Sequence, residues 1–201
     1  MIMTHKQFIK RLDAYKNAET VTADIKWLET KQDLDYFDIC ADKLLDLGVG
    51  SVLDLACGKA QFLKKTMERG ISSFGIEPRI IDGNGIGKEP YVARASFESL
   101  IEYAKSDTEH IPIFDCIVIN NTMHGMQKKS NIDLLIQDLF NFFIKYTNYI
   151  VITEPQWSTW GDNQNHFKKK CQFPEKFELI HEFKGSHGGK TAFHNIYKVL
   201  K

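Results

Sequence analysis

One continuous stretch, residues 51–79, limits the folds open to this chain more than any other part of the sequence. It reads SVLDLACGKAQFLKKTMERGISSFGIEPR. An apolar run at residues 52–56 is short enough for a buried strand, and a tight turn of small residues follows it. The next apolar side chains recur at a helical spacing that stops at Gly70, and residues 73–76 have the composition of a second strand. The stretch predicts a strand–turn–helix–strand unit of an α/β sheet.

The turn and the acidic residue that follows the second strand suit a ligand that carries a ribose. Small residues in a turn let the backbone approach a ligand closely, and a helix N-terminus offers unpaired N–H groups. Glu77 ends the second strand, 19 residues after Gly58. A carboxylate in that place can accept hydrogen bonds from both hydroxyls of a ribose. The pattern indicates an adenosine-type ligand.

The spacing of the small residues separates two classes of nucleotide site. A dinucleotide site is expected to show G-x-G-x-x-G. The small positions here are Ala56, Gly58 and Ala60, and the position of that motif's last glycine has no glycine. Asp54 lies within the end of the first strand. This pattern resembles motif I of the class I S-adenosylmethionine-dependent methyltransferases, commonly D-x-x-x-G-x-G, with Ala60 where that family usually has glycine. A dinucleotide-binding unit is the alternative interpretation.

Later segments extend the resemblance. Residues 114–121 form the clearest later strand and resemble the family's motif IV, and residues 177–183 and 193–200 alternate like the strands of a hairpin. A closing antiparallel hairpin distinguishes the methyltransferase sheet from a plain dinucleotide domain. The resemblance implies an α/β fold, a three-layer Rossmann-like sandwich plus N-terminal helices. Its seven-stranded sheet would be mostly parallel, with an antiparallel C-terminal hairpin and strand order 3-2-1-4-5-7-6.

The length of the chain fits one domain with an extension, since it has 201 residues and about 45 of them precede the first strand. We expect residues 1–48 to form an N-terminal helical extension or lid. Residues 49–201 would then form the S-adenosylmethionine-binding methyltransferase domain. In the family, such an extension often folds over the active site and helps to bind substrate, and packing on one face of the sheet is the alternative.

The resemblance also implies which residues hold the cofactor S-adenosylmethionine, whose product after transfer is S-adenosylhomocysteine. Motif I, the helix after it and the second strand supply Asp54, Ala56, Cys57, Gly58, Phe62, Glu77 and Pro78. Ser96 and Phe97 match the family's segment that lines the adenine, although simple helix capping explains Ser96 equally well. Asn120 and Asn121 end the fourth strand, near the expected place of the reactive methyl group.

Two residues are candidates for the base that removes a proton from the methyl acceptor. His124 follows the fourth strand, and an imidazole titrates near neutrality when it is unperturbed. A structural histidine at the start of a helix is the alternative reading of His124. Glu154 ends the fifth strand, where an acidic residue is common in the family. None of the seven histidines forms an H-x-x-H motif, so no metal is expected.

Composition narrows the expected partners and the expected compartment. The formal net charge is zero, and no nucleic-acid-binding module is appended, so a nucleic-acid partner is not favoured. The four cysteines are far apart without a C-x-x-C motif, which suggests buried thiols in a cytoplasmic protein. No apolar run approaches the length of a membrane span. A monomer or homodimer is expected.

These observations predict an enzyme that transfers a methyl group from S-adenosylmethionine to an O or N atom of a small molecule or sugar. An RNA or protein methyltransferase is an alternative acceptor class. A catalytically inactive binding protein with the methyltransferase fold is another alternative. It is motivated by Ala60 and by residues 78–87, which read as a loop where the family usually has a helix. A dinucleotide oxidoreductase is the third alternative.

Overall fold

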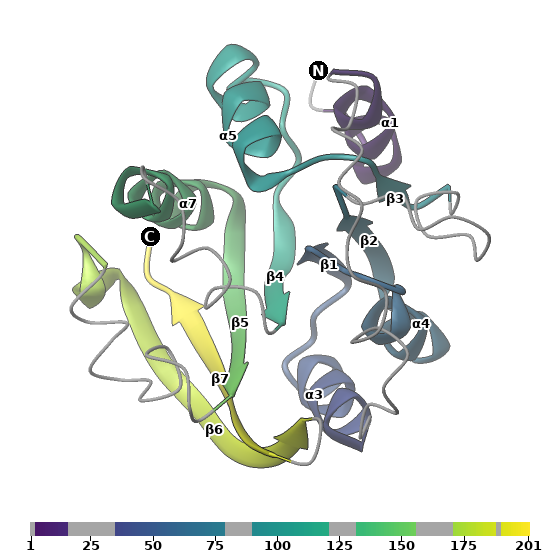
Figure 1. Ribbon diagram of the computed structural model, residues 1–201, viewed down its shortest axis with the longest axis vertical. Coiled ribbons are helices and arrows are strands. Elements are labelled where there is room, and N and C mark those ends of the chain that lie inside the picture. The colour runs from purple at the N-terminus through teal and green to yellow at the C-terminus, as the bar shows by residue number, and fades with distance from the viewer. Residues whose placement is uncertain (1–2, 16–34, 79–89, 121–131, 156–170, 188–189) are drawn as a thin grey trace.

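A computed structural model describes residues 3–15, 35–78, 90–120, 132–155, 171–187 and 190–201. The helices are α1 (His5–Tyr15), α3 (Asp35–Asp46), α4 (Gln61–Glu68), α5 (Phe97–Ser106) and α7 (Ile132–Tyr146), with a 3₁₀ turn at Pro174–Lys176. The strands are β1 (Ser51–Leu55), β2 (Ser72–Ile76), β3 (Val92–Ala93), β4 (Phe114–Asn120), β5 (Thr147–Pro155), β6 (Phe177–His187) and β7 (Lys190–Val199). Strands and helices alternate through the middle of the chain, and two long strands end it (Figure 1).

The strands form one seven-stranded sheet in the order β3-β2-β1-β4-β5-β7-β6. Parallel pairing joins β3 to β2, β2 to β1, β1 to β4 and β4 to β5. β7 is antiparallel to both of its neighbours, β5 and β6. The predicted fold is therefore confirmed, including the strand order and the closing hairpin.

The strand order indicates that a ligand would bind at the carboxyl ends of β1 and β4. From β1 the chain proceeds through β2 to β3 on one side, and it then returns to add β4 on the other side of β1. Connections that leave neighbouring parallel strands in opposite directions open a space between them, and ligands of open α/β sheets bind there. The carboxyl ends of β4 and β5 point downward in Figure 1, toward the N-terminal end of α3.

Helices cover the two faces of the sheet (Figure 1), and an apolar core lies under each helix layer. Helices α1, α5 and α7 pack on one face, against side chains such as Leu53, Ile117 and Ile150. Helices α3 and α4 pack on the other face, against Val52 and Val118. Successive strand residues face opposite layers, so a five-residue strand such as β1 is buried throughout. The result is the three-layer sandwich that the sequence predicts.

Helix α1 is an integral part of this sandwich. Phe8, Ile9 and Leu12 lie on one side of the helix and are buried in the core that it shares with α5. The Asp13 carboxylate accepts a hydrogen bond of 2.7 Å from the backbone N–H of Arg94, next to β3. Packing on the sheet therefore describes α1, and residues 16–34 of the predicted helical extension lie outside the described residues.

The structure also bears on the expectations for the cysteines, for membrane spans and for metal sites. All four cysteines, Cys40, Cys57, Cys116 and Cys171, are buried free thiols. Within the described ranges, no helix combines the length and the apolar character that crossing a bilayer requires. Within those same ranges, His, Cys, Asp and Glu side chains do not converge in groups of three that could hold a metal ion.

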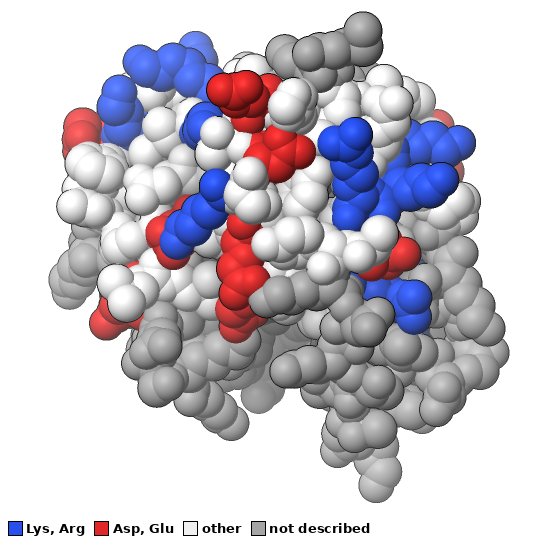
Figure 2. All heavy atoms as spheres, turned by 90° about the horizontal axis from the view of Figure 1, so that it is seen from above, with Lys and Arg blue, Asp and Glu red and all other residues white. Residues whose placement is uncertain are grey.

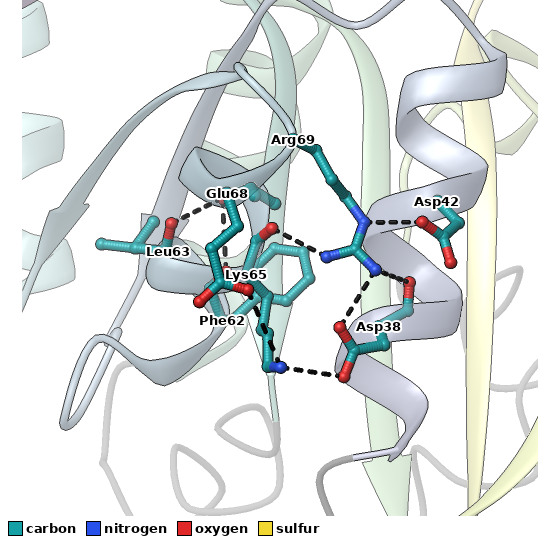
Figure 3. A network of polar contacts seen from close by, with 8 residues as sticks. Asp38, Asp42, Phe62, Leu63, Lys65, Glu68 and Arg69 are labelled. Atoms are coloured by element: carbon teal, nitrogen blue, oxygen red, sulfur yellow. Dashed lines mark hydrogen bonds and ion pairs between the residues drawn. The ribbon is translucent and has the colours of Figure 1, made fainter.

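A network of ion pairs joins α3 to α4, the helix that follows the small-residue turn (Figure 3). The Arg69 guanidinium donates to Asp42 Oδ1 at 2.6 Å and to Asp38 Oδ1 at 3.0 Å. It also donates to the backbone carbonyl of Lys65 at 3.0 Å, and the Lys65 ammonium lies 3.1 Å from Asp38 Oδ2. The network fixes the position of α3 relative to the turn.

Replacing Arg69 with leucine is expected to lower the free energy of unfolding by about 1 kcal/mol, because the guanidinium joins two carboxylates on a partly exposed surface. Hydrogen bonds from Lys65 and Arg69 lower the pKa values of Asp38 and Asp42 respectively. The stabilisation is therefore present above the usual carboxyl pKa of about 3.9 and is lost as the pH falls through the lowered values. Urea denaturation of both proteins at neutral pH and at about pH 3 measures the difference.

Lys43→Leu is the matched control, since Lys43 pairs with Asp46 only within α3, at 3.7 Å and largely exposed. Its expected effect is close to zero. An Arg69 variant that lost the same free energy at both pH values would show that packing of the side chain, and not its charge, holds the two helices together.

Candidate functional site

The small-residue turn between β1 and α4 has a backbone conformation that few side chains tolerate. Ala56, Gly58 and Ala60 have φ angles of 62°, 53° and 55°, so every second residue of the turn is left-handed. Glycine adopts this region freely, whereas alanine is strained there. The predicted turn is therefore present, and Ala60 adopts the conformation that glycine would adopt at the same position.

Backbone hydrogen bonds hold this turn against the end of β2. The Cys57 N–H donates to the Ile76 carbonyl at 2.9 Å, and the Ala60 N–H donates to the Cys57 carbonyl at 2.9 Å. Ala60 is also the residue before α4, and its carbonyl accepts from the Lys64 N–H at 3.0 Å. Phe62 is buried one residue into the helix, so α4 starts from a fixed position on the sheet. This rigidity prepares the turn to receive a ligand.

Gly75 of β2 allows the turn to approach the strand so closely. A Cβ atom on Gly75 would lie 2.7 Å from Cys57 Sγ and 2.8 Å from a methyl carbon of Leu63. Real Cβ atoms essentially never come so near to other heavy atoms. The sequence reasoning placed Gly75 in a strand without assigning it a role. The signal that could have found it is a glycine inside a strand, which often marks a close backbone approach.

Glu77 connects the end of β2 to the turn. Its side chain is fully buried, and its Oε2 accepts a hydrogen bond of 2.9 Å from the Gly58 N–H. Its own backbone N–H donates to the Ala93 carbonyl at 3.0 Å, which fixes it beside β3. Pro78 follows and is half-buried. The structure thus brings together Gly58 and Glu77, which the sequence predicted to serve one ligand.

Asp54 lies on β1, two residues before the turn, and it faces the layer of α3 and α4. It is 2% exposed, and its Oδ1 has no hydrogen-bond partner among the described residues. Burial raises the pKa of this carboxyl well above its ordinary value, and the nearby Glu77 raises it further. An acidic group in such a place is costly to ionise unless a cation or a donor reaches it.

Ser96 and Phe97 form the start of α5, next to β3. The Ser96 side chain accepts a hydrogen bond of 3.2 Å from the Ser99 N–H, so it caps the helix as the sequence predicted. Phe97 is buried against the core of the α5 layer. The capping role of Ser96 is thus observed, and a role of either residue toward an adenine ring stays a prediction.

Asn120 ends β4 and begins a row of polar side chains on the α3 side of the sheet. It is half-buried and lies in register with Thr153 of β5, which in turn lies opposite His194 of β7. Thr153 Oγ1 and His194 Nδ1 are 3.0 Å apart, and both side chains are buried. The imidazole contacts the rings of Tyr36 from α3 and Phe183 from β6, with ring centroids 4.3 and 4.6 Å away. The sequence reasoning missed this buried pair.

Glu154, one of the two predicted bases, lies near the end of β5 and is fully buried. Its backbone is paired with Phe193 of β7. It points to the opposite face from Thr153, since successive strand residues alternate. His124, the other candidate, and Asn121 lie outside the described residues, as do residues 79–87 of the predicted loop.

A separate hollow of about 500 Å³ lies at the opposite end of the strands, between Asp115, Asn148 and the C-terminal residues 198–201. Its polar groups serve the fold. Asp115 accepts hydrogen bonds from the Gly50 N–H and the Ser51 hydroxyl, both at 3.0 Å. The Lys201 ammonium donates to the carbonyls of Ile144 and Thr147 at the end of α7. The candidate site is therefore the region at the carboxyl ends of β1, β2 and β4.

Glycine at position 56 is expected to stabilise the free protein by about 0.5–1 kcal/mol. The left-handed conformation costs alanine about 1–2 kcal/mol, and the greater freedom of glycine in the unfolded chain cancels about 0.5–1 kcal/mol of the gain. Ala60→Gly is the matched comparison. Ala60 is 3% exposed, so its replacement also loses a buried methyl group worth about 0.8 kcal/mol and should be nearly neutral. Urea denaturation of both variants measures the change in the free energy of unfolding. An Ala56→Gly protein less stable than the wild type would show that the backbone of Ala56 is not strained.

Comparison with known proteins places this arrangement among known folds. The sequence matches no family model, and it matches no curated protein. The structure is similar to that of 1,6-didemethyltoxoflavin-N1-methyltransferase from Burkholderia thailandensis, solved with 1,6-didemethyltoxoflavin and S-adenosylhomocysteine bound. The TM-score is 0.60 and the identity 9%, over 100% of this chain and 92% of that chain.

Two further structures are similar over almost the whole chain. The N-methyltransferase NodS from Bradyrhizobium japonicum WM9, in complex with S-adenosylhomocysteine, has a TM-score of 0.57 and 11% identity, over 99% of this chain and 100% of that chain. PH1948 from Pyrococcus horikoshii, a proposed RNA methyltransferase, has a TM-score of 0.55 and 14% identity, over 99% of this chain and 98% of that chain. With its strand order, its closing hairpin and these neighbours, the chain has the fold of the class I S-adenosylmethionine-dependent methyltransferases.

Proposed function

We propose that this protein transfers a methyl group from S-adenosylmethionine to an O or N atom of a small molecule or sugar. The observation that carries the proposal is the joining of the left-handed turn to Glu77. The buried carboxylate accepts the Gly58 N–H at 2.9 Å and so stands beside the backbone that a nucleoside must approach. Two structural neighbours that hold S-adenosylhomocysteine support the same ligand class.

We assign each part of this cofactor to a group of the described residues. Glu77 would accept hydrogen bonds from the ribose hydroxyls, with Pro78 beside it. Ser96 and Phe97, at the start of α5, would border the adenine. The turn Ala56–Cys57–Gly58 would face the middle of the ligand, and Phe62 would support the turn from behind. Asp54 and Asn120 lie on neighbouring strands and would face the amino-acid end. Asp54 Oδ1, which has no hydrogen-bond partner among the described residues, requires a donor or a cation there.

When bound, the cofactor supplies a methyl group on a positively charged sulfur, which is already activated for displacement. The chain therefore has to hold the acceptor in line and, for a hydroxyl, to remove its proton. Glu154 at the end of β5 is the described candidate for this base, and His124 is the second candidate. Residues 1–48 would form the N-terminal helical segment that helps to bind the acceptor, with residues 49–201 as the cofactor-binding domain.

The distribution of charge supports the proposed acceptor class. The formal net charge is zero. On the face viewed in Figure 2, the described acidic and basic side chains are interspersed, so both signs share this face. A long polyanion is held best by an extended basic surface. A small acceptor needs none, and the toxoflavin methyltransferase among the neighbours was solved with such a molecule bound.

The test is titration calorimetry with S-adenosylmethionine and S-adenosylhomocysteine, followed by methyl transfer from radiolabelled S-adenosylmethionine. The acceptors are a panel of small molecules and sugars on one side and total RNA on the other. Micromolar binding, about −8 kcal/mol, together with label in the small-molecule panel is the expected result. Label in RNA alone would show that the acceptor is RNA and not a small molecule or sugar. Binding with no transfer to any acceptor would favour an inactive binding protein, and no binding would refute the proposed cofactor.

A further inference from the structure

Asp54 is the most isolated acidic group that the structure describes. Its side chain is 2% exposed, and its Oδ1 has no hydrogen-bond partner among the described residues. The residue lies in register with Gly75 on one side and Val118 on the other, so neither of the residues directly opposite it offers a polar side chain. A carboxylate in such surroundings would be left without compensation for the water it has lost.

The titratable groups around Asp54 do not supply that compensation. Cys40 of α3 and Cys116 of β4 face it, and Glu77 approaches it from the end of β2. Burial raises the pKa of Cys40 to about 12, and it raises that of Cys116 well above its ordinary value, so both thiols stay neutral. Glu77 adds negative charge. Within the described part of the chain, no lysine, arginine or histidine contributes to the field at Asp54.

Asp54 also stands where the amino-acid end of the proposed ligand would lie. It is two residues before the left-handed Ala56, and it shares a sheet face with Asn120 through the register of β1 with β4. The ribose would be held one strand away, at Glu77. A ligand that extends from Glu77 across the turn toward β4 carries its ammonium group past Asp54.

We infer that Asp54 holds a proton in the free protein and releases it when the ammonium group of an S-adenosyl ligand binds beside it. The O–H bond of the Asp54 carboxyl breaks, the proton passes to a buffer base, and the carboxylate pairs with the ligand cation. Asp54 thereby makes the site select the intact amino-acid tail over a truncated nucleoside. The inference rests on the proposed function and adds a dependence of cofactor affinity on pH.

The sign of that dependence follows from the proton balance. While Asp54 is protonated in the free protein and ionised in the complex, one proton leaves on binding. Affinity for a ligand that displaces one proton rises up to tenfold for each unit of pH. The rise ends at the pH where the free protein has already lost the proton, or where the ligand ammonium itself begins to deprotonate.

The experiment is calorimetric titration of the full chain with S-adenosylhomocysteine near neutral pH, in buffers of different ionisation enthalpy. The expected heat changes with the buffer by an amount that corresponds to about one proton released. The same titration with 5′-methylthioadenosine is the key control. This ligand has the adenosine half but no amino-acid tail, so it should bind through Glu77 and release no proton.

Two variants assign the proton to its residue. Asp54→Asn keeps the shape of the side chain, and it should bind S-adenosylhomocysteine about tenfold more weakly, without dependence on buffer or pH. Cys40→Ala removes a neighbour and leaves the carboxyl in place, so it should keep the proton release. Thermal unfolding gives an independent readout. As the pH rises, the free Asp54→Asn protein should become more stable relative to the wild type, because unfolding lets the wild-type carboxyl ionise at its ordinary pKa while the folded wild type holds it protonated.

The outcomes separate this inference from the proposed function. Binding of S-adenosylhomocysteine with the same heat in every buffer would overturn the inference and leave the proposed function in place. Equal proton release by 5′-methylthioadenosine would also overturn it, because the proton would then come from the adenosine half of the site. Failure of both ligands to bind would overturn the proposed function and the inference together. The wild-type comparison of the two ligands decides the question even if Asp54→Asn does not fold.

Discussion

Replacing Glu77 with alanine is expected to weaken the binding of S-adenosylhomocysteine by at least about 100-fold, or about 3 kcal/mol. The carboxylate is fully buried and would accept hydrogen bonds from two ribose hydroxyls, while it already accepts one from the Gly58 N–H at 2.9 Å. Alanine would remove all three acceptor contacts. It would also leave the Gly58 N–H without this acceptor, which costs about 1–3 kcal/mol of folding stability. Calorimetry and urea denaturation measure the two effects separately.

Glu77→Gln is the matched control for this prediction. The amide oxygen of glutamine can still accept the Gly58 N–H, so the turn and the folding stability should be largely kept. The amide accepts less strongly than a carboxylate, and its NH₂ group cannot accept at all. We therefore expect about a tenfold loss of affinity with nearly unchanged stability. If both variants bound S-adenosylhomocysteine with wild-type affinity, Glu77 would not contribute to the ligand site.

A methyl group at position 75 is expected to destabilise the protein by about 2–3 kcal/mol. In Gly75→Ala, the new Cβ would lie 2.7 Å from Cys57 Sγ, 2.8 Å from Leu63 Cδ1 and 2.9 Å from Cys57 Cβ. The last of these atoms is next to the backbone of the turn, so relief requires the turn and the start of α4 to move away from β2. The displaced turn should also bind S-adenosylhomocysteine more weakly, even though no side chain of the site has been removed.

Gly50→Ala provides the control, because a Cβ there would make ordinary contact with its nearest atom, Asp115 Oδ2, at 3.4 Å. This variant should be as stable as the wild type within about 0.5 kcal/mol. Urea denaturation compares the two variants directly. If Gly75→Ala were as stable as Gly50→Ala, the close approach of the turn to β2 would not be needed for folding.

Much of the fold could be predicted from the sequence because the relevant signals are local. The apolar run before Ala56, the helical spacing after Ala60 and the stop at Gly70 each depend on residues within a few positions of one another. The cap at Ser96 is of the same kind, since its acceptor and donor are three residues apart. The final hairpin was visible in the alternation of its two strands. Strand order then followed from the family resemblance and not from the residues themselves.

Other features of the candidate site depend on which strands become neighbours. Thr153 and His194 are 41 positions apart and meet only because β7 inserts beside β5. Gly75 has a specific role only because Cys57 and Leu63 are folded onto it. Asp54 looks like an ordinary motif residue until the packing of Cys40 and Cys116 shows that nothing among the described residues neutralises it.

The sequence by itself therefore determined the strand–turn–helix unit, the turn of small residues, and the acidic residue after β2. Local backbone preference and hydrophobic periodicity are enough for these features, because they act within one element. Only the tertiary structure decided that Glu77 bonds to the turn, that α3 is tied to α4 through Arg69, and that Asp54 is buried beside neutral thiols. Burial and pairing depend on the distance between elements, and that distance is set when the sheet is assembled.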